Sequence, residues 1–128
     1  MQYVIKKIDG KPYEFDIVNC DTVKIYKECE LLGRYDLTKN VFYASVDKDW
    51  GFKAWDLLTN RQQRLVLLQA NKYLFKVYKN AYYSDVKAGR FFAPTKDNLE
   101  AQNYYCDKIN SIKANIELLQ KEDTKIYS

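Results

Sequence analysis

The chain has 128 residues, of which 47% are hydrophobic, and a formal net charge of +4. This length corresponds to one ordinary domain, and the hydrophobic share is large enough to form a buried core. The sequence contains no histidine, which excludes Ser–His and Cys–His nucleophile systems and the histidine-based zinc protease and deaminase signatures. The modest positive charge allows phosphate or acidic protein partners without requiring them.

The three cysteines, Cys20, Cys29 and Cys106, form no CxxC pair, and no zinc site, other metal site or cofactor is predicted. We expect them to be buried, reduced thiols of a cytoplasmic protein. The first residues, MQYVIKK, do not have the pattern of a secretion signal. No membrane span is expected either, because the longest strictly aliphatic run covers only residues 65–68.

Residues 3–18 predict a β-hairpin. Asp9 and Gly10 are a favoured pair for a tight turn with positive φ, and apolar and charged residues alternate after the turn. Pro12 cannot donate a ladder hydrogen bond. We therefore expect the second strand either to lie at a sheet edge or to begin after this proline.

Short elements are expected between this hairpin and residue 59. The first is a helix capped by Asn19 or Asp21 and ended by Gly33. Its predicted buried face comprises Thr22, Ile25, Cys29 and Leu32. Residues 40–46, NVFYASV, predict a third strand because they are rich in β-branched and aromatic side chains.

A second short helix is expected to run to Leu58. Asp47 or Asp49 can cap its first turn, where an acidic side chain also suits the helix dipole. The residues predicted to face inward are Trp50, Ala54 and Leu57.

Residues 60–88 predict a long central helix, which begins after a capping box formed by Thr59 and Gln62. Small or apolar residues recur along it at steps of three and four, the spacing of a seam that packs along a partner helix. These residues are Leu67, Ala70, Leu74, Val77, Ala81, Ser84 and Ala88. The first turns are apolar nearly all round, so we expect the N-terminal unit to cover them.

A last helix is expected from a cap at Thr95 to about Lys121, after a short link that starts at Gly89. Its seam residues alternate by four and three and comprise Tyr105, Ile109, Ile112, Ile116 and Leu119. Two long helices with matched seams and a short link predict an antiparallel helical hairpin. Residues 122–128 are expected to form a frayed tail.

The predicted fold is therefore α+β. A small N-terminal antiparallel sheet, made of the β-hairpin and a third strand, combines with short helices and packs on a long C-terminal antiparallel two-helix hairpin. We expect one domain over residues 1–128, with a small α/β unit at 1–58 and the helical hairpin at 60–121.

The face of the central helix opposite its seam is a candidate nucleic-acid site. Tyrosines alternate there with basic side chains, and such a surface can stack on bases and neutralise phosphates, or dock an acidic protein. The basic residues are Arg61, Lys72, Lys76 and Lys79. The alternative is a solvated face whose lysines pair with acidic residues of the last helix, namely Asp97, Glu100, Asp107 or Glu117.

The far end of the helical hairpin is a candidate protein-binding site. Aromatic anchors within a charged surround commonly carry most of the energy of a protein interface. The residues of this type are Tyr78, Tyr82, Tyr83, Arg90, Phe91 and Phe92. The alternative is that Phe91 and Phe92 only plug the end of the helix pair.

No reaction motif is present, so we expect a non-catalytic function. Small domains rich in Lys, Asn and Tyr resemble, in composition only, accessory proteins of low-GC bacteria and their phages, a group that includes inhibitors of host-defence nucleases. The resemblance implies a protein-binding accessory or inhibitory module that can act on a nucleic-acid machine. The alternative is direct nucleic-acid binding through the basic, tyrosine-rich face of the central helix. Self-association is also open.

Overall fold

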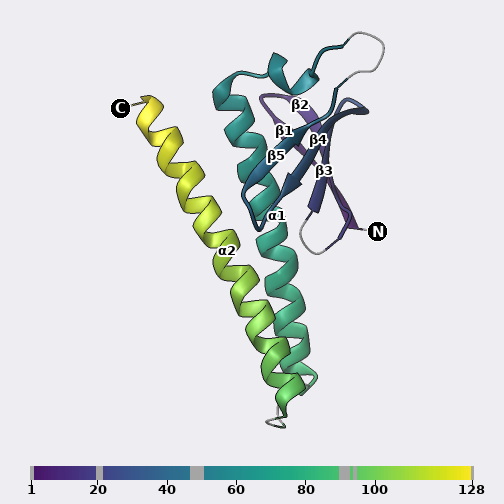
Figure 1. Cartoon of the computed structure of the whole chain (residues 1–128), viewed down its shortest axis with the longest axis vertical. Helices are drawn as coiled ribbons and strands as arrows, with labels where there is room; N and C mark the ends of the chain where they lie inside the picture. Colours follow the sequence, from purple (N-terminus) through teal and green to yellow (C-terminus); the bar gives the residue numbers. More distant parts are fainter. Residues whose placement is uncertain (1, 20–21, 47–50, 90–92, 94, 128) are drawn as a thin grey trace.

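The computed structural model describes residues 2–19, 22–46, 51–89, 93 and 95–127 (Figure 1). The strands are β1 (Gln2–Ile8), β2 (Lys11–Ile17), β3 (Thr22–Lys27), β4 (Glu30–Asp36) and β5 (Val41–Ala44). They are followed by the short 3-10 helix η1 (Ala54–Leu57) and the long helices α1 (Asn60–Lys87) and α2 (Lys96–Tyr127). The predicted α+β fold, with an antiparallel sheet before a two-helix hairpin, is confirmed.

The sheet is an antiparallel meander with the order β1-β2-β3-β4-β5. Asp9 (φ 52°) and Gly10 (φ 80°) form the predicted turn between β1 and β2. Both alternatives predicted for β2 are wrong, because β2 pairs with strands on both sides and begins at Lys11, before Pro12. Pro12 is tolerated because the pairing of β2 with β3 begins only after it, at Tyr13.

The prediction of a helix between Asn19 and Gly33 is wrong, since this segment forms β3, a turn and β4. Its apolar residues fit a helical spacing, but Val23 and Ile25 also alternate, and both are fully buried on the sheet. The turn uses Glu28 (φ 51°) and Cys29 (φ 69°), and therefore carries no glycine signal.

Gly33, predicted to end that helix, lies inside β4 instead. A Cβ atom there would collide with the Tyr43 carbonyl oxygen and the Phe42 ring on the neighbouring strand. Glycine is thus required at this position by the close approach of β5.

The predicted third strand is confirmed as β5, whereas the helix predicted up to Leu58 is reduced to η1 within the described residues. The prediction that Leu57 faces inward is wrong, since it is 75% exposed. Trp55 is buried instead and stacks on Phe42 of β5, with 3.9 Å between ring centroids. Asp47, Asp49 and Trp50 lie outside the described residues.

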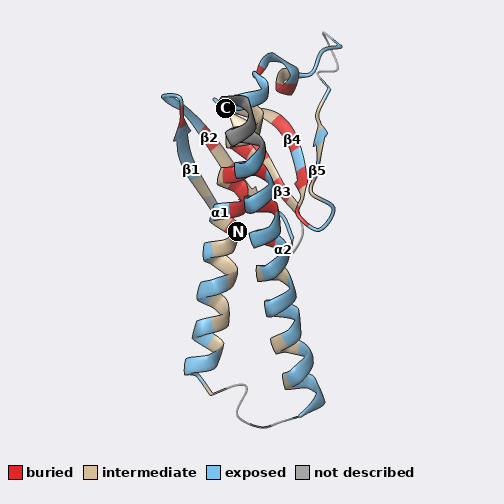
Figure 2. Ribbon diagram, turned by 90° about the vertical axis from the view of Figure 1, so that its left-hand side faces the viewer, coloured by how far each residue is buried: buried red, intermediate tan, exposed pale blue. Residues whose placement is uncertain are grey.

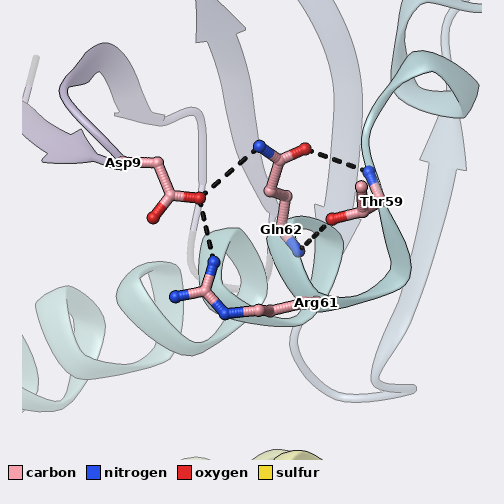
Figure 3. Close-up of polar contacts among 4 residues, drawn as sticks. All are labelled: Asp9, Thr59, Arg61 and Gln62. Carbon is pink, nitrogen blue, oxygen red and sulfur yellow. Dashed lines mark hydrogen bonds and ion pairs between the residues drawn. The ribbon is translucent and has the colours of Figure 1, made fainter.

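The predicted capping box at the start of α1 is confirmed (Figure 3). The Gln62 backbone N–H donates to Thr59 Oγ1 at 3.1 Å, and the Thr59 backbone N–H donates to Gln62 Oε1 at 3.0 Å. These two bonds satisfy amide groups that the first turn of a helix leaves without partners.

The sheet curves around the N-terminal half of α1, and α1 lies between the sheet and α2 (Figures 1 and 2). The core combines side chains from the inner face of the sheet with one stripe of α1 and Ile112 of α2, and Leu37, Trp55 and Leu58 from the connecting segments join it. Its fully buried members include Tyr13, Phe15, Val23, Ile25, Leu32, Tyr35, Val66, Ala70, Leu74 and Ile112.

The predicted seam is fully buried only where the sheet covers the helices, and its members Val77, Ala81, Tyr105 and Ile109 farther out are half-buried. Ala70 and Leu74 of α1 are buried, whereas Ser84 and Ala88 at the other end are exposed. On α2, Ile112 and Leu119 are buried. The helix continues to Tyr127, beyond the predicted end at Lys121.

A buried polar network joins the sheet to both helices. Asn71 Nδ2 of α1 donates to the Tyr35 hydroxyl of β4 at 3.0 Å, and Tyr35 donates to Asn40 Oδ1. Asn115 Nδ2 of α2 donates to Asn71 Oδ1 at 3.2 Å and to the Leu37 carbonyl at 3.0 Å. Burial, partly offset by the bond from Asn71, raises the pKa of Tyr35 to about 12.

Truncating either of two buried aliphatic side chains in the core should destabilise the fold. We expect Leu74→Ala and Ile112→Ala each to lower the free energy of unfolding by about 2–5 kcal/mol, because both side chains are buried and leave a cavity. Urea unfolding measures this effect. Leu118→Ala is the control on α2, where the side chain is 52% exposed, and a comparable loss in this control would contradict the assigned helix faces.

The Tyr35 hydroxyl should make folding stability fall at high pH. Its pKa rises from 10.0 to about 12 on folding. The protonated hydroxyl therefore contributes fully to the free energy of unfolding below pH 10, and this contribution is lost as pH rises toward 12. The shift corresponds to about 3 kcal/mol. We expect Tyr35→Phe to flatten the decline of stability over this range in urea melts. Identical pH profiles for the two proteins would show that Tyr35 ionises normally.

Candidate partner-binding surfaces

One half of the helical hairpin projects beyond the sheet (Figures 1 and 2). We call residues 75–89 and 95–111 the free half. Within these described residues no side chain is classed as buried, whereas the first turns of α1 contain Val66, Leu68 and Ala70 in the core. The free half is therefore more exposed than the rest of the hairpin, and only its start, where Phe75 and Tyr78 pack against the core, is partly covered by the sheet.

Tyrosines from both helices meet on the free half. Tyr82 of α1 lies edge-on to Tyr105 of α2, with 5.9 Å between ring centroids, and each ring has a further tyrosine beside it. The Tyr105 hydroxyl donates to Asp85 Oδ2 at 3.0 Å. We call Tyr82, Tyr83, Tyr104 and Tyr105 the tyrosine cluster.

Two members of this cluster remain open to solvent, since Tyr83 is 52% and Tyr104 is 41% exposed. Each carries a lysine ammonium over its ring, Lys79 at 5.8 Å from Tyr83 and Lys108 at 5.8 Å from Tyr104. The cluster thus combines exposed aromatic area with positive charge. The apolar side chains of Val86 and Leu99 are also exposed on the free half.

An apolar hollow of about 400 Å³ lies where the tyrosine cluster meets the end of β2. Its walls come from the sheet end and from both helices. They comprise Ile17, Asn19, Leu74, Val77, Tyr78, Ala81, Tyr104 and Tyr105. The hollow has the size and the apolar lining to accept a large apolar side chain.

The residues predicted for protein binding are only partly brought together. Tyr82 and Tyr83 lie in the tyrosine cluster, and Tyr78 lines the adjoining apolar hollow. Arg90, Phe91 and Phe92 lie outside the described residues. Tyr104 was not predicted, although its position beside the seam residue Tyr105 could have indicated it.

A different hollow, of about 430 Å³, lies between β1 and α1. Lys72 and Lys76, predicted from the sequence, line it together with Lys6 of β1. Lys6 pairs with the buried Tyr13 in the sheet register, so both side chains lie on the sheet face that packs against α1. We call this site the lysine hollow. Its other lining residues are Val4, Gln69, Tyr73, Val77 and Asn80.

The two remaining basic residues of the predicted nucleic-acid site lie apart from the lysine hollow. Arg61 Nη1 forms an ion pair at 3.0 Å with Asp9 Oδ2 in the β1–β2 turn (Figure 3). Lys79 lies over the rings of Phe75, at 5.6 Å, and Tyr83. Arg61 therefore anchors the β-hairpin to the start of α1.

Within the described residues, Lys72, Lys76 and Lys79 form no ion pair with the acidic residues of α2 that the sequence suggested as partners. Tyr73 shares the lysine hollow with the first two lysines. Burial raises the pKa of Tyr73, and the negative charge of Asp16 raises it further. The Tyr73 hydroxyl therefore stays protonated and can donate a hydrogen bond.

The prediction of buried cysteines is wrong for the two that the structure describes. Cys29 occupies the β3–β4 turn, Cys106 lies on an outward face of α2, and both are exposed free thiols. Cys20 lies outside the described residues. In the part of the chain that the structure describes, no three Cys, Asp or Glu side chains gather as metal ligands.

No helix among the described residues is long and apolar enough to cross a membrane. Comparison of the chain with protein-family models, with curated proteins and with solved structures gives no match. The two surfaces must therefore be interpreted from their own chemistry.

Proposed function

We propose that the chain is a non-catalytic protein-binding module, with an accessory or inhibitory role, that contacts its partner through the free half of the hairpin. The observation that supports this most is the position of the tyrosine cluster beside the apolar hollow, on the part of the helices that projects beyond the sheet. Tyrosine offers wide contact area at low entropic cost, and exposed aromatic patches commonly mark contact sites.

The partner of this surface is a protein with an apolar anchor flanked by acidic side chains. The anchor fills the apolar hollow, whose lining includes Tyr78 and Tyr104. The acidic side chains face the lysines that lie over Tyr83 and Tyr104. Binding to such a partner can block or position a nucleic-acid machine, the role that the composition of the chain suggests.

We place this activity in the cytoplasm. Cys29 and Cys106 are exposed free thiols, and exposed thiols persist best in a reducing compartment.

Truncation of the exposed tyrosines should weaken partner binding without unfolding the chain. We expect Tyr83→Ala and Tyr104→Ala each to change the free energy of unfolding by about 1 kcal/mol or less. The same variants should weaken partner binding by about tenfold or more. The matched control is Tyr43→Ala, which removes a tyrosine that is 50% exposed on β5, away from the free half.

The partner is first captured from a nuclease-treated bacterial lysate, identified and purified, and its affinity for each variant is then measured by calorimetry. A partner that requires nucleic acid for capture would contradict the proposal. So would an equal loss of affinity in Tyr43→Ala. If sedimentation shows that the captured partner is a second copy of the chain, the surface serves self-association instead.

A further inference from the structure

We propose that the lysine hollow is a second binding site, which takes the phosphate backbone of a single-stranded nucleic acid. The site uses three lysines distinct from Lys79 and Lys108, which lie over rings of the tyrosine cluster. It depends on the approach of two elements far apart in the sequence, because Lys6 comes from β1 and Lys72 and Lys76 come from α1.

The lysine hollow concentrates positive charge that its own lining does not neutralise. Lys72 and Lys76 are four residues apart on one helix face, where like charges destabilise a helix slightly. Lys6 adds a third ammonium group from the sheet, and the lining itself contains no Asp or Glu, the carboxylate that acts on Tyr73 being that of Asp16 outside the lining. Within the described residues none of the three forms an ion pair. A bound polyanion would remove this mutual repulsion.

The polar groups of the hollow can all donate hydrogen bonds. Lysine ammonium groups only donate, and the side-chain amides of Gln69 and Asn80 can donate as well. The Tyr73 hydroxyl remains a donor, since its pKa is raised. Phosphate oxygens are acceptors, so a phosphate group is complementary to this set.

Aromatic side chains next to the lysines favour a single strand over a duplex. Tyr73 lines the hollow itself. Farther along α1, Lys79 and Tyr83 follow Lys76 at three and seven residues, which places them on the same helix face. Unpaired bases can stack on such rings, whereas the base faces of a duplex are already stacked on each other. An acidic peptide would use the lysines but would have no bases to stack on the rings.

The test measures binding of a fluorescently labelled oligothymidylate of about 20 nucleotides to the full chain, by anisotropy, over about 50–200 mM salt. The variant is Lys6→Gln combined with Lys72→Gln and Lys76→Gln. The matched control is Lys39→Gln combined with Lys53→Gln and Lys96→Gln, three exposed lysines away from the hollow. The variant and the control each lose three positive charges, so the net charge falls from +4 to +1 in both.

We expect the variant to reduce the slope of log K against log salt by about two, because each phosphate contact to a single strand contributes about 0.7. The control should keep the wild-type slope, and thermal melts should show both proteins folded. If the triple variant fails to fold, Lys6→Gln alone, at an exposed position, should reduce the slope by about 0.7.

Three results would overturn the proposal. The first is that the wild-type chain does not bind the oligonucleotide even at the lowest salt. The second is that the slope changes equally in the variant and the control. The third is that polyglutamate of matched length binds as tightly as the oligonucleotide. The last result would assign the hollow to an acidic protein. The protein contact is tested separately, because the lysine variant should bind the captured protein partner as well as wild type does.

Discussion

The Asn71 side-chain amide is the contact on which the arrangement of this fold depends most. It donates to Tyr35 of β4 and to the Leu67 carbonyl of its own helix, and it accepts from Asn115 of α2. A buried amide is costly unless its hydrogen bonds are made. A helix rotated or shifted by one turn would leave these polar groups without partners, in addition to moving Val66, Ala70 and Leu74 out of the core. The network therefore selects one register among sheet, α1 and α2.

This register decides which parts of the molecule are open to partners. The network and the core occupy only the inner half of the hairpin: Leu74 is the last buried residue described in α1, and the free half extends beyond it. The apolar hollow forms at this boundary, with the tyrosine cluster next to it. The same packing brings Lys6 of β1 beside α1 and creates the lysine hollow. Val77 lines both hollows, so the two surfaces lie on adjacent sides of one helix.

Features with a strong local signal could be predicted from the sequence. The turn at Asp9 and Gly10 and the capping box at Thr59 depend on nearby residues only, and the inner part of the helix seam follows the spacing of apolar residues along α1. The β3–β4 hairpin could not, because its turn contains no glycine and its apolar spacing suits a helix as well as a strand. The place of Lys6 in the lysine hollow also could not be predicted, because it depends on how β1 lies against α1. Tyr82 and Tyr83 were found because tyrosines are concentrated in that stretch, while the apolar hollow depends on tertiary packing.

The most direct test of this account is a double-mutant cycle between the two buried asparagines. Urea unfolding would be measured for Asn71→Ala, Asn115→Ala and the double variant. The account predicts that each single change costs about 1–3 kcal/mol or more, because it leaves buried polar groups without partners. It also predicts a coupling energy of about 0.5–3 kcal/mol between the two positions. Single variants as stable as wild type, or costs that add to within about 0.3 kcal/mol, would contradict the claim that this network fixes the sheet and both helices in one register.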